Sequence, residues 1–409
     1  MSKRLPISST WLILATIVIL IMIVEAVVIH RIYATQYPGT ADFFARWYGA
    51  KELVLRQRNP YTREIELEAQ YAMFGRYTEP HEDQVNFAYP LYTVFLFWPL
   101  TLTDYAWAQA IWMVVLQFSL MGMAMMLFGI VRWRPPPWLF VLTIFWSIFF
   151  YPGARAIMLG QFSVIVALGL LVCVWALLNG YDILAGLVLP LTTVKPQMVF
   201  LIIPFLLLWA WRQKRWRFII SSAGGMAFLF LASVIWVPNW PLLFVQTLSA
   251  YSDYVGFGSP LENMTARFTP GFDTVLNPVI TVILAGFLLW QWWQVLTKSP
   301  EKFLWALSWT LLISSLIAFR SATANHVILF LPMFLVFKRL ARAPWQVVTV
   351  QIGGSLLLWV LFLTTIDTSR GSNFEAVFMH GFLPTLLILL FFIDGTRLKT
   401  STPDLKVSS

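Results

Sequence analysis

The sequence predicts an all-α protein that crosses a lipid bilayer about 12 times. Of its 409 residues, 59% are hydrophobic and 11% are charged, whereas soluble domains contain about 25% charged residues. Several apolar runs reach the roughly 20 residues that a helix needs to cross the hydrocarbon core. The clearest runs are 11–29, 107–131, 218–237, 275–296 and 345–364. The alternating pattern of a β-barrel is absent, so these runs predict a bundle of transmembrane helices.

The charge pattern predicts how the bundle is oriented. The net charge of +9 comes from short Lys and Arg clusters beside apolar runs, which indicates topology rather than nucleic-acid binding. The positive-inside rule places both termini in the cytoplasm and the two long loops, 33–85 and 238–274, outside. We expect a multi-pass protein of the cytoplasmic membrane, with one membrane domain over 1–396 and a cytoplasmic tail over 397–409. The single cysteine excludes a disulfide framework.

The first span and the loop after it are the first elements. The run 11–29 has no small-residue cleavage site behind it, so we expect it to be retained as a span. The loop 33–85 carries dense charge of both signs, and its apolar and aromatic residues recur at helical spacing between residues 43 and 54. This spacing predicts a helix that lies along the membrane interface with its charges toward water.

The next part of the chain allows two topologies. Arg132 and Arg134 favour a cytoplasmic turn, but a count of apolar runs places them outside, so one element must be broken or re-entrant. Either 86–103 enters the membrane and returns, or 183–211 is one long helix kinked around Pro196. The arginines favour the first alternative.

Polar residues at the edges of apolar runs are the candidates for chemistry. Asp42 follows the first span, where a carboxylate could act as a general base, although such an aspartate is more often a helix cap. Arg155 and Gln161 lie in YPGARAIMLGQFS at 151–163, which interrupts two apolar runs. Lys195 stands between two further runs, where a charge costs about 2.5–3.5 kcal/mol, so a functional role is favoured over snorkelling from a loop.

Three more polar residues lie in later loops. Arg267 belongs to the loop 238–274, and His326 follows Arg320 at the start of an apolar run. Each of them can equally be an ordinary loop residue. The sequence has no HExxH motif, no Cys/His cluster, no Walker A loop and no GxGxxG, so it predicts neither a metal site nor a nucleotide cofactor.

Short motifs occur in a characteristic order after the first span. A stretch from Asp42 ends in Asn-Pro-Tyr at Tyr61, and it is followed by FAYPLYTVFLFWPL at 87–100, LGQFS at 159–163 and AGLVLPLTTVKPQ at 185–197. In this order the chain resembles glycosyltransferase family 87. That family includes polyprenol-phosphate-mannose-dependent mannosyltransferases of the GT-C class. The similarity runs over the first half of the chain and continues more weakly beyond it.

The resemblance implies an all-helical GT-C fold with interfacial helices over a membrane-embedded groove. It implies a metal-independent, inverting hexosyltransferase that moves a sugar, expected to be mannose, from a polyprenyl-phosphate donor to a hydroxyl of a lipid or glycan acceptor at the outer membrane face. Asp42 matches the family's general base, Lys195 its intramembrane lysine and His326 its late histidine. Gln161 matches the glutamine of a GQxN pattern, in which Ser163 here replaces the asparagine.

The mechanism that these residues suggest needs cations, because a departing phosphate carries about one to two negative charges. The candidate cations are Lys195, Arg155, Arg267 and Arg320. Tyr61 and Tyr89 could stack on sugar faces, and His326 could orient the phosphate or the acceptor. No cofactor is expected beyond the lipid-phosphate sugar, and no nucleic acid is expected as a partner.

Two other functions compete with the transferase. A secondary transporter would bind an anionic solute through Lys195 and Arg155 near the midplane of the bilayer, and inverted repeats would favour it. A lipid-linked glycan flippase or ligase would share these cations but would need no carboxylate base. The sequence shows no inverted pair of broken helices and has a charged loop directly after the first span, which favours the transferase.

Overall fold

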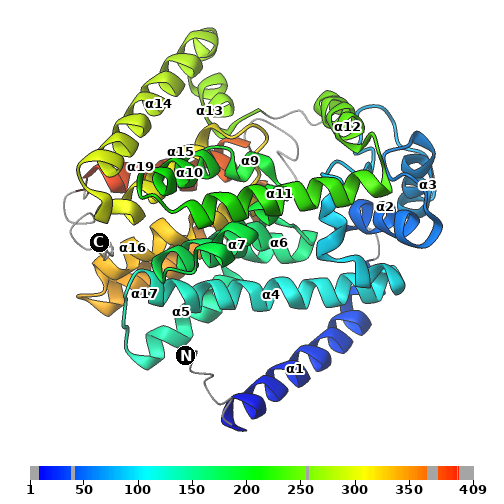
Figure 1. Cartoon of the computed structure of the whole chain (residues 1–409), viewed down its shortest axis with the longest axis horizontal. Helices are drawn as coiled ribbons and strands as arrows, with labels where there is room; N and C mark the ends of the chain where they lie inside the picture. The colour runs from blue at the N-terminus through cyan, green and yellow to red at the C-terminus, as the bar shows by residue number, and fades with distance from the viewer. Residues whose placement is uncertain (1–8, 38–41, 255–257, 366–375, 394, 396–409) are drawn as a thin grey trace.

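The computed structural model describes residues 9–37, 42–254, 258–365, 376–393 and 395. All regular structure in this part of the chain is helical, which confirms the predicted all-α class. In Figure 1 the long helices α4 (Tyr105–Ile130) and α11 (Trp216–Trp236) cross the molecule in the same general direction. Helices α2 (Phe43–Arg56) and α3 (Arg63–Phe74) lie together at one end (Figure 1).

Within the described ranges, six helical segments are long and apolar enough to cross a membrane. They are α1 (Ser9–Ile29) continued by η1 (His30–Ala34), α4, α11, α14 (Asp273–Thr297), η6 (Thr323–Leu329) continued by α16 (Phe330–Leu340), and α17 (Pro344–Thr365). A seventh is possible if α5 (Pro137–Phe149) and α6 (Tyr151–Leu159), which meet at an angle of 49°, form one broken span. The expectation of about 12 spans is therefore not confirmed.

The difference from the expected count has a physical cause. Five further apolar helical segments in the described part of the chain contain only 10 to 17 residues, and at about 1.5 Å per residue they fall short of roughly 30 Å of hydrocarbon. They are α7 (Ser163–Leu178), α8 (Asp182–Val188) continued by η4 (Leu189–Val194), α10 (Ile202–Arg212), α15 (Phe303–Ile317), and the segment Val377–Ile393, which spans most of η7 (Ala376–Gly381) and all of α19 (Phe382–Ile393). An apolar run in the sequence does not tell where a helix inside it stops.

The remaining described elements connect these helices. They are η2 (Leu91–Leu96), η3 (Trp98–Leu102), α9 (Pro196–Val199), α12 (Trp240–Tyr254), α13 (Pro260–Phe268) and η5 (Pro300–Lys302). Residues 86–103 thus contain two short 3₁₀ helices, and 183–211 is divided into several short helices rather than one kinked helix. The second long loop, 238–274, carries α12 and α13, while the predicted tail, 397–409, lies outside the described residues.

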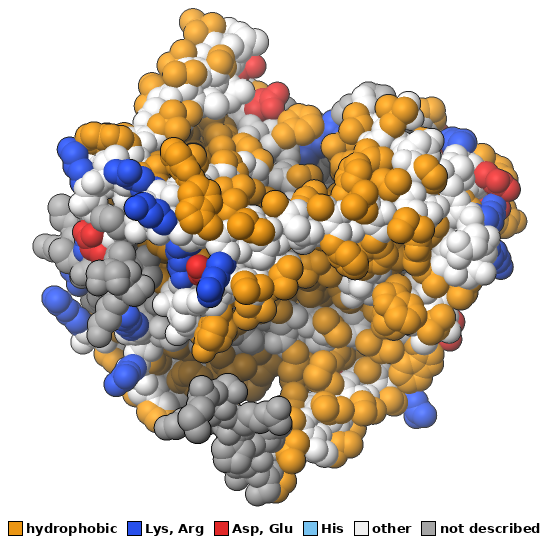
Figure 2. Space-filling model, viewed as in Figure 1, with side chains coloured by type: hydrophobic (Ala, Val, Ile, Leu, Met, Phe, Trp, Pro, Cys, Tyr) orange, Lys and Arg blue, Asp and Glu red, His pale blue; other side chains and the backbone are white. Residues whose placement is uncertain are grey.

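The helices differ in how much of their surface they present outward. Only 6% of the α1 span is buried, compared with 83% of the span formed by η6 and α16. Figure 2 shows apolar side chains over the middle of the visible face and most Lys and Arg toward its two ends. Such a broad apolar surface is suited to lipid rather than water. Gln117 of α4 donates a hydrogen bond to Glu25 of α1, so a polar contact holds this outer helix to the bundle.

The predicted helix in the first loop is confirmed as α2. Its buried face packs on the core of the bundle, and the indole of Trp47 donates a hydrogen bond of 3.0 Å to the carbonyl of Leu100. Glu52, which is 3% exposed, accepts hydrogen bonds of 2.8 Å from both Arg56 and Arg58. Arg58 also bonds Glu68 of α3 at 2.7 Å, so this charge network fixes the two helices to each other. The position of α2 in the membrane interface stays a prediction.

Candidate active site

Four polar side chains from distant parts of the chain form a hydrogen-bonded row. The amide nitrogen of Gln161 donates to Oδ2 of Asp42. The ammonium of Lys195 donates to the amide oxygen of Gln161 at 2.6 Å and to Oδ1 of Asn325 at 2.9 Å. We call Asp42, Gln161, Lys195 and Asn325 the polar row. The carboxylate and the ammonium are thus joined through one amide instead of pairing directly.

Asp42 begins the row at the N-terminus of α2. The residue stands at the cap position, but its side chain makes no capping hydrogen bond, so capping does not account for it. The positive end of the helix dipole still favours its negative charge. Oδ2 is engaged by Gln161, and Oδ1 takes part in no hydrogen bond among the described residues. One oxygen is therefore held in place while the other remains available to a ligand.

Gln161 is positioned by a tight turn at the end of α6. Gly160 has a positive φ of 65°, and a Cβ on it would lie 2.6 Å from Cβ of Phe43. The indole nitrogen of Trp112 donates a hydrogen bond of 2.9 Å to the carbonyl of Gly160. The rings of Phe43 and Trp112 stack at 5.1 Å. The turn is thus clamped between α2 and α4, which fixes Gln161 against Asp42.

Lys195 and Asn325 come from two further interruptions of helical structure. Lys195 lies between η4 and α9 with φ −124° and ψ 79°, and the next residue, Pro196, has no backbone N–H to continue a helix. Asn325 lies in η6, which packs against α6 and α7. Both side chains are buried, so the contact between them is shielded from solvent.

A second group of residues lies beside the row. Nη1 of Arg46 donates a hydrogen bond of 2.6 Å to the carbonyl of Asp42, and its guanidinium lies 4.7 Å from the ring centroid of Tyr89. The hydroxyl of Tyr61 donates to the carbonyl of Tyr89 at 2.6 Å, and the ring of Tyr89 packs 5.3 Å from Phe162. Burial raises the pKa of Tyr61, so this hydroxyl remains a donor at neutral pH. Tyr61 and Tyr89 thus flank the Gln161 turn.

Asp83 is a second carboxylate near this group. Solvent reaches its side chain, but surrounding protein and the negative charge of Asp42 raise its pKa, burial being the larger cause. The backbone N–H of Val85, which donates to Asp83 at 2.9 Å, and the positive charge of Arg46 act in the opposite direction. The first loop therefore brings a carboxylate and a guanidinium to the vicinity of Asp42.

The other predicted residues lie outside the hydrogen bonds of the row. His326 is buried in η6 directly after Asn325. Arg155 lies on α6 with its guanidinium 5.4 Å from an aromatic ring of α17, and Arg267 is exposed at the end of α13. Arg320 has a positive φ of 54° and lies 4.6 Å from the ring of the preceding phenylalanine. The structure thus joins three of the predicted residues, Asp42, Gln161 and Lys195, directly.

Two residues of the site were missed by sequence reasoning. Asn325 precedes His326 in the motif TANH, and of these two residue types histidine is the more frequent participant in chemistry. Arg46 is one of many charges in the loop 33–85. The available signal was its spacing of four residues from Asp42, which places both side chains on one face of a helix.

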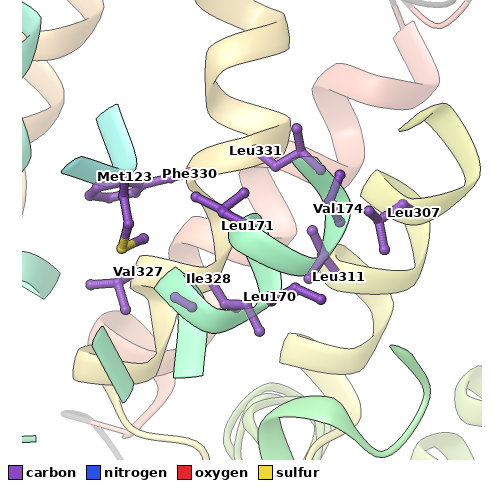
Figure 3. Close-up of a pocket in the computed structure, with 11 residues that line it drawn as sticks. Met123, Leu170, Leu171, Val174, Leu307, Leu311, Val327, Ile328, Phe330 and Leu331 are labelled. Carbon is purple, nitrogen blue, oxygen red and sulfur yellow. The ribbon is translucent and has the colours of Figure 1, made fainter. Parts of the chain in front are cut away.

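The structure also contains a small cavity elsewhere in the bundle (Figure 3). Its lining comes from α4, α7, α15, η6 and α16, and every lining side chain is apolar. Such a cavity offers no hydrogen bonds to a sugar or a phosphate, so it is a packing space rather than a substrate site. Among the described residues no group of three or more His, Cys, Asp or Glu side chains could hold a metal ion.

The pattern of glycosyltransferase family 87 matches residues 87–319, which is more than half of the 409-residue chain. The chain belongs to glycosyltransferase family 87. No curated protein and no solved structure matches it. In this glycosyltransferase, Gln161 and Lys195 lie within the matched region, while Asp42 and Asn325 lie outside it.

Proposed function

We propose that this glycosyltransferase moves a sugar, mannose in the first instance, from a polyprenyl-phosphate donor to a hydroxyl of a lipid or glycan acceptor. The polar row is the observation that supports the proposal most. It holds a carboxylate with one available oxygen and an ammonium that is separated from it by one amide. A base for the acceptor and a cation for the leaving phosphate can therefore act together without neutralising each other.

The proposed reaction is a single displacement. Oδ1 of Asp42 takes the proton of the acceptor hydroxyl, and the acceptor oxygen attacks the anomeric carbon of the donor. The bond from that carbon to the phosphate oxygen breaks as the new bond forms, so the configuration inverts. The transition state has oxocarbenium character, as in glycoside hydrolysis. The polyprenyl phosphate leaves with the bonding electrons, and Lys195 stabilises its added negative charge.

Each other residue of the row has a positioning role in this proposal. Gln161 orients Asp42 through its amide N–H and Lys195 through its amide oxygen. Asn325 accepts a second hydrogen bond from the ammonium, and its neighbour His326 is assigned to orienting the phosphate or the acceptor. The phosphate contacts expected of Arg155, Arg267 and Arg320 stay predictions, as does sugar stacking by the tyrosines.

The proposal places the polar row on the external side of the cytoplasmic membrane, with both termini inside. The positive-inside rule supports this orientation, since α2 and α3 follow the first span. It includes no metal ion, because a phosphate is already a stabilised leaving group that protein cations can hold.

The test is sugar transfer from radiolabelled polyprenyl-phosphate mannose in membranes that contain the wild type or Asp42→Asn. We expect the variant to lose about 10²- to 10⁴-fold in rate, the usual contribution of a general base, while it still binds the donor. Asp104→Asn is the matched control, because Asp104 caps α4 through the backbone N–H of Trp107 and asparagine caps equally well.

The transfer experiment also separates the competing functions. An Asp42→Asn variant that transfers sugar like the wild type would remove Asp42 from the mechanism. Absence of transfer by the wild type from a panel of lipid-phosphate sugars would refute the proposed donor class. Solute uptake by the chain in proteoliposomes would then identify it as a transporter.

A further inference from the structure

We propose that Arg46 is the second cation of the donor phosphate site and that it acts together with Lys195. This inference rests on the proposed function and goes further, because it assigns the phosphate to a residue of the first loop. The ligand chemistry is a phosphate monoester or diester carried by a polyprenyl lipid. The arginine binds the phosphate oxygens and takes no part in proton transfer.

The position of Arg46 on α2 is the first reason. Arg46 stands one helical turn after Asp42, and its side chain turns back toward the start of the helix, as long helical side chains do. The hydrogen bond of 2.6 Å to the carbonyl of Asp42 holds it there. The guanidinium therefore lies at the same end of α2 as the proposed base.

The second reason is that aromatic packing holds the guanidinium near the Gln161 turn. The distance of 4.7 Å to the ring of Tyr89 is typical of a cation–π contact. Tyr89 in turn packs on Phe162, the residue after Gln161, and its carbonyl is bonded by Tyr61. A planar guanidinium held in this way can present parallel N–H groups to two phosphate oxygens.

The third reason is electrostatic. The charges of Asp42 and Arg46 both act on Lys195, the carboxylate more strongly than the guanidinium, and the charge of Arg46 also acts on Asp83. Two cations that repel each other in a partly buried site raise the free energy of the unliganded protein. A bound phosphate removes this repulsion because its negative charge attracts both cations. A neutral ligand does not relieve this repulsion, so the arrangement favours an anion.

A buried hydroxyl beside these charges provides an independent indication of a polar ligand. Tyr105 is 7% exposed, and its hydroxyl has no hydrogen-bond partner among the described residues. Asp42 and Arg46 are among the charged groups whose fields act on it. Buried hydroxyls in native proteins usually have partners. A phosphate or sugar oxygen between Arg46 and Asp42 would supply the missing one.

Arg155 and Arg267 have no such connection to the polar row among the described residues. Arg155 lies over an aromatic ring at 5.4 Å, and Arg267 is exposed. Arg46, by contrast, is hydrogen-bonded to the residue that carries the proposed base. We therefore expect Arg46 rather than Arg155 to share the phosphate with Lys195.

The experiment measures binding to the purified full chain in detergent, without any sugar transfer. The probes are polyprenyl phosphate, inorganic phosphate and the phosphate-free polyprenol. We expect Arg46→Gln to weaken binding of polyprenyl phosphate roughly 10- to 100-fold, the usual range for a charged hydrogen bond, and to leave polyprenol binding unchanged. Arg56→Gln is the matched control, since Arg56 lies on the same helix with its side chain 63% exposed.

Several results would overturn the inference. Unchanged affinity of Arg46→Gln for polyprenyl phosphate would exclude Arg46 from the phosphate site. An equal loss of affinity in Arg56→Gln would show that the effect comes from the net charge of the protein rather than from Arg46. Inorganic phosphate that binds as tightly as polyprenyl phosphate would overturn the inference, because Arg46 and Lys195 would then form a site for free phosphate rather than for the lipid-linked phosphate. None of these results would refute the proposed transferase function, because its test is sugar transfer that depends on Asp42.

A second measurement uses the wild type alone, so it tests the inference even if the Arg46→Gln chain does not fold. Phenylglyoxal modifies exposed arginines, and mass spectrometry locates the modified residues. We expect polyprenyl phosphate to protect Arg46 of the wild type several-fold and to leave Arg56 unprotected. Equal modification of Arg46 with and without polyprenyl phosphate would overturn the inference.

Discussion

The turn at Gly160 provides a sharp test of how the polar row is built. In Gly160→Ala the new Cβ would lie 2.6 Å from Cβ of Phe43 and 3.3 Å from the ring of Trp112. The left-handed backbone costs an alanine about 1–2 kcal/mol, and overpacking adds about 1–3 kcal/mol. We expect the free energy of unfolding to fall by roughly 2–5 kcal/mol in total. Relief of the clash moves Gln161 away from Asp42, so the rate of sugar transfer should fall as well as the stability.

Gly180→Ala is the control for this prediction. Gly180 also has a positive φ, 78°, but a Cβ there would meet nothing within 4 Å. Backbone strain alone should therefore cost about 1–2 kcal/mol, and transfer should be retained. The assay compares thermal unfolding of the purified chains with sugar transfer in membranes. Equal unfolding temperatures and equal transfer rates for the two variants would refute the idea that the Gly160 contact positions the row.

Three further predictions concern the row and the first loop. Lys195→Met should lower sugar transfer roughly 100-fold while the chain still folds, because the cation for the leaving group is lost; an unchanged rate would exclude that role. Trp112→Phe removes the hydrogen bond to the carbonyl of Gly160 and should lower the unfolding free energy by about 1–3 kcal/mol, measured by thermal unfolding in detergent. The hydrogen bond from Arg58 lowers the pKa of Glu68, so its stabilisation is complete above the ordinary glutamate pKa and is lost as the pH falls through the lowered value. Unfolding temperature against pH should show this acid loss in the wild type, and Arg58→Gln should weaken it.

Much of the fold class and part of the site could be predicted from the sequence. Apolar runs and sparse charge suffice to predict an all-α membrane protein, because in a bilayer a helix satisfies the hydrogen bonds of its backbone within one segment. Asp42, Gln161 and Lys195 could be selected because each is a polar residue at an interruption of an apolar run. That these three side chains bond to one another depends on how the helices pack, and no local pattern carries that information.

The number of spans is a prediction from the sequence that the structure does not confirm. Hydropathy reports how apolar a segment is, whereas a span also requires a continuous helix of sufficient length. The segment 183–211 is apolar almost throughout, but it is divided around Lys195 into short helices. Asn325 was missed for a related reason, since an uncharged amide hardly changes the hydropathy of its surroundings.

The polar row has a consequence for how the protein is made. Its bonded partners are separated by 119, 34 and 130 positions along the chain, and Asn325 is the last to leave the ribosome. Until then Lys195 has only part of its final hydrogen bonding, and the unfinished chain must carry this cation through insertion. A stalled or shortened product that ends before Asn325 would contain the base and the ammonium but not the group that completes their alignment. Synthesis itself thus delays the appearance of a finished site until the main body of the helical bundle is present.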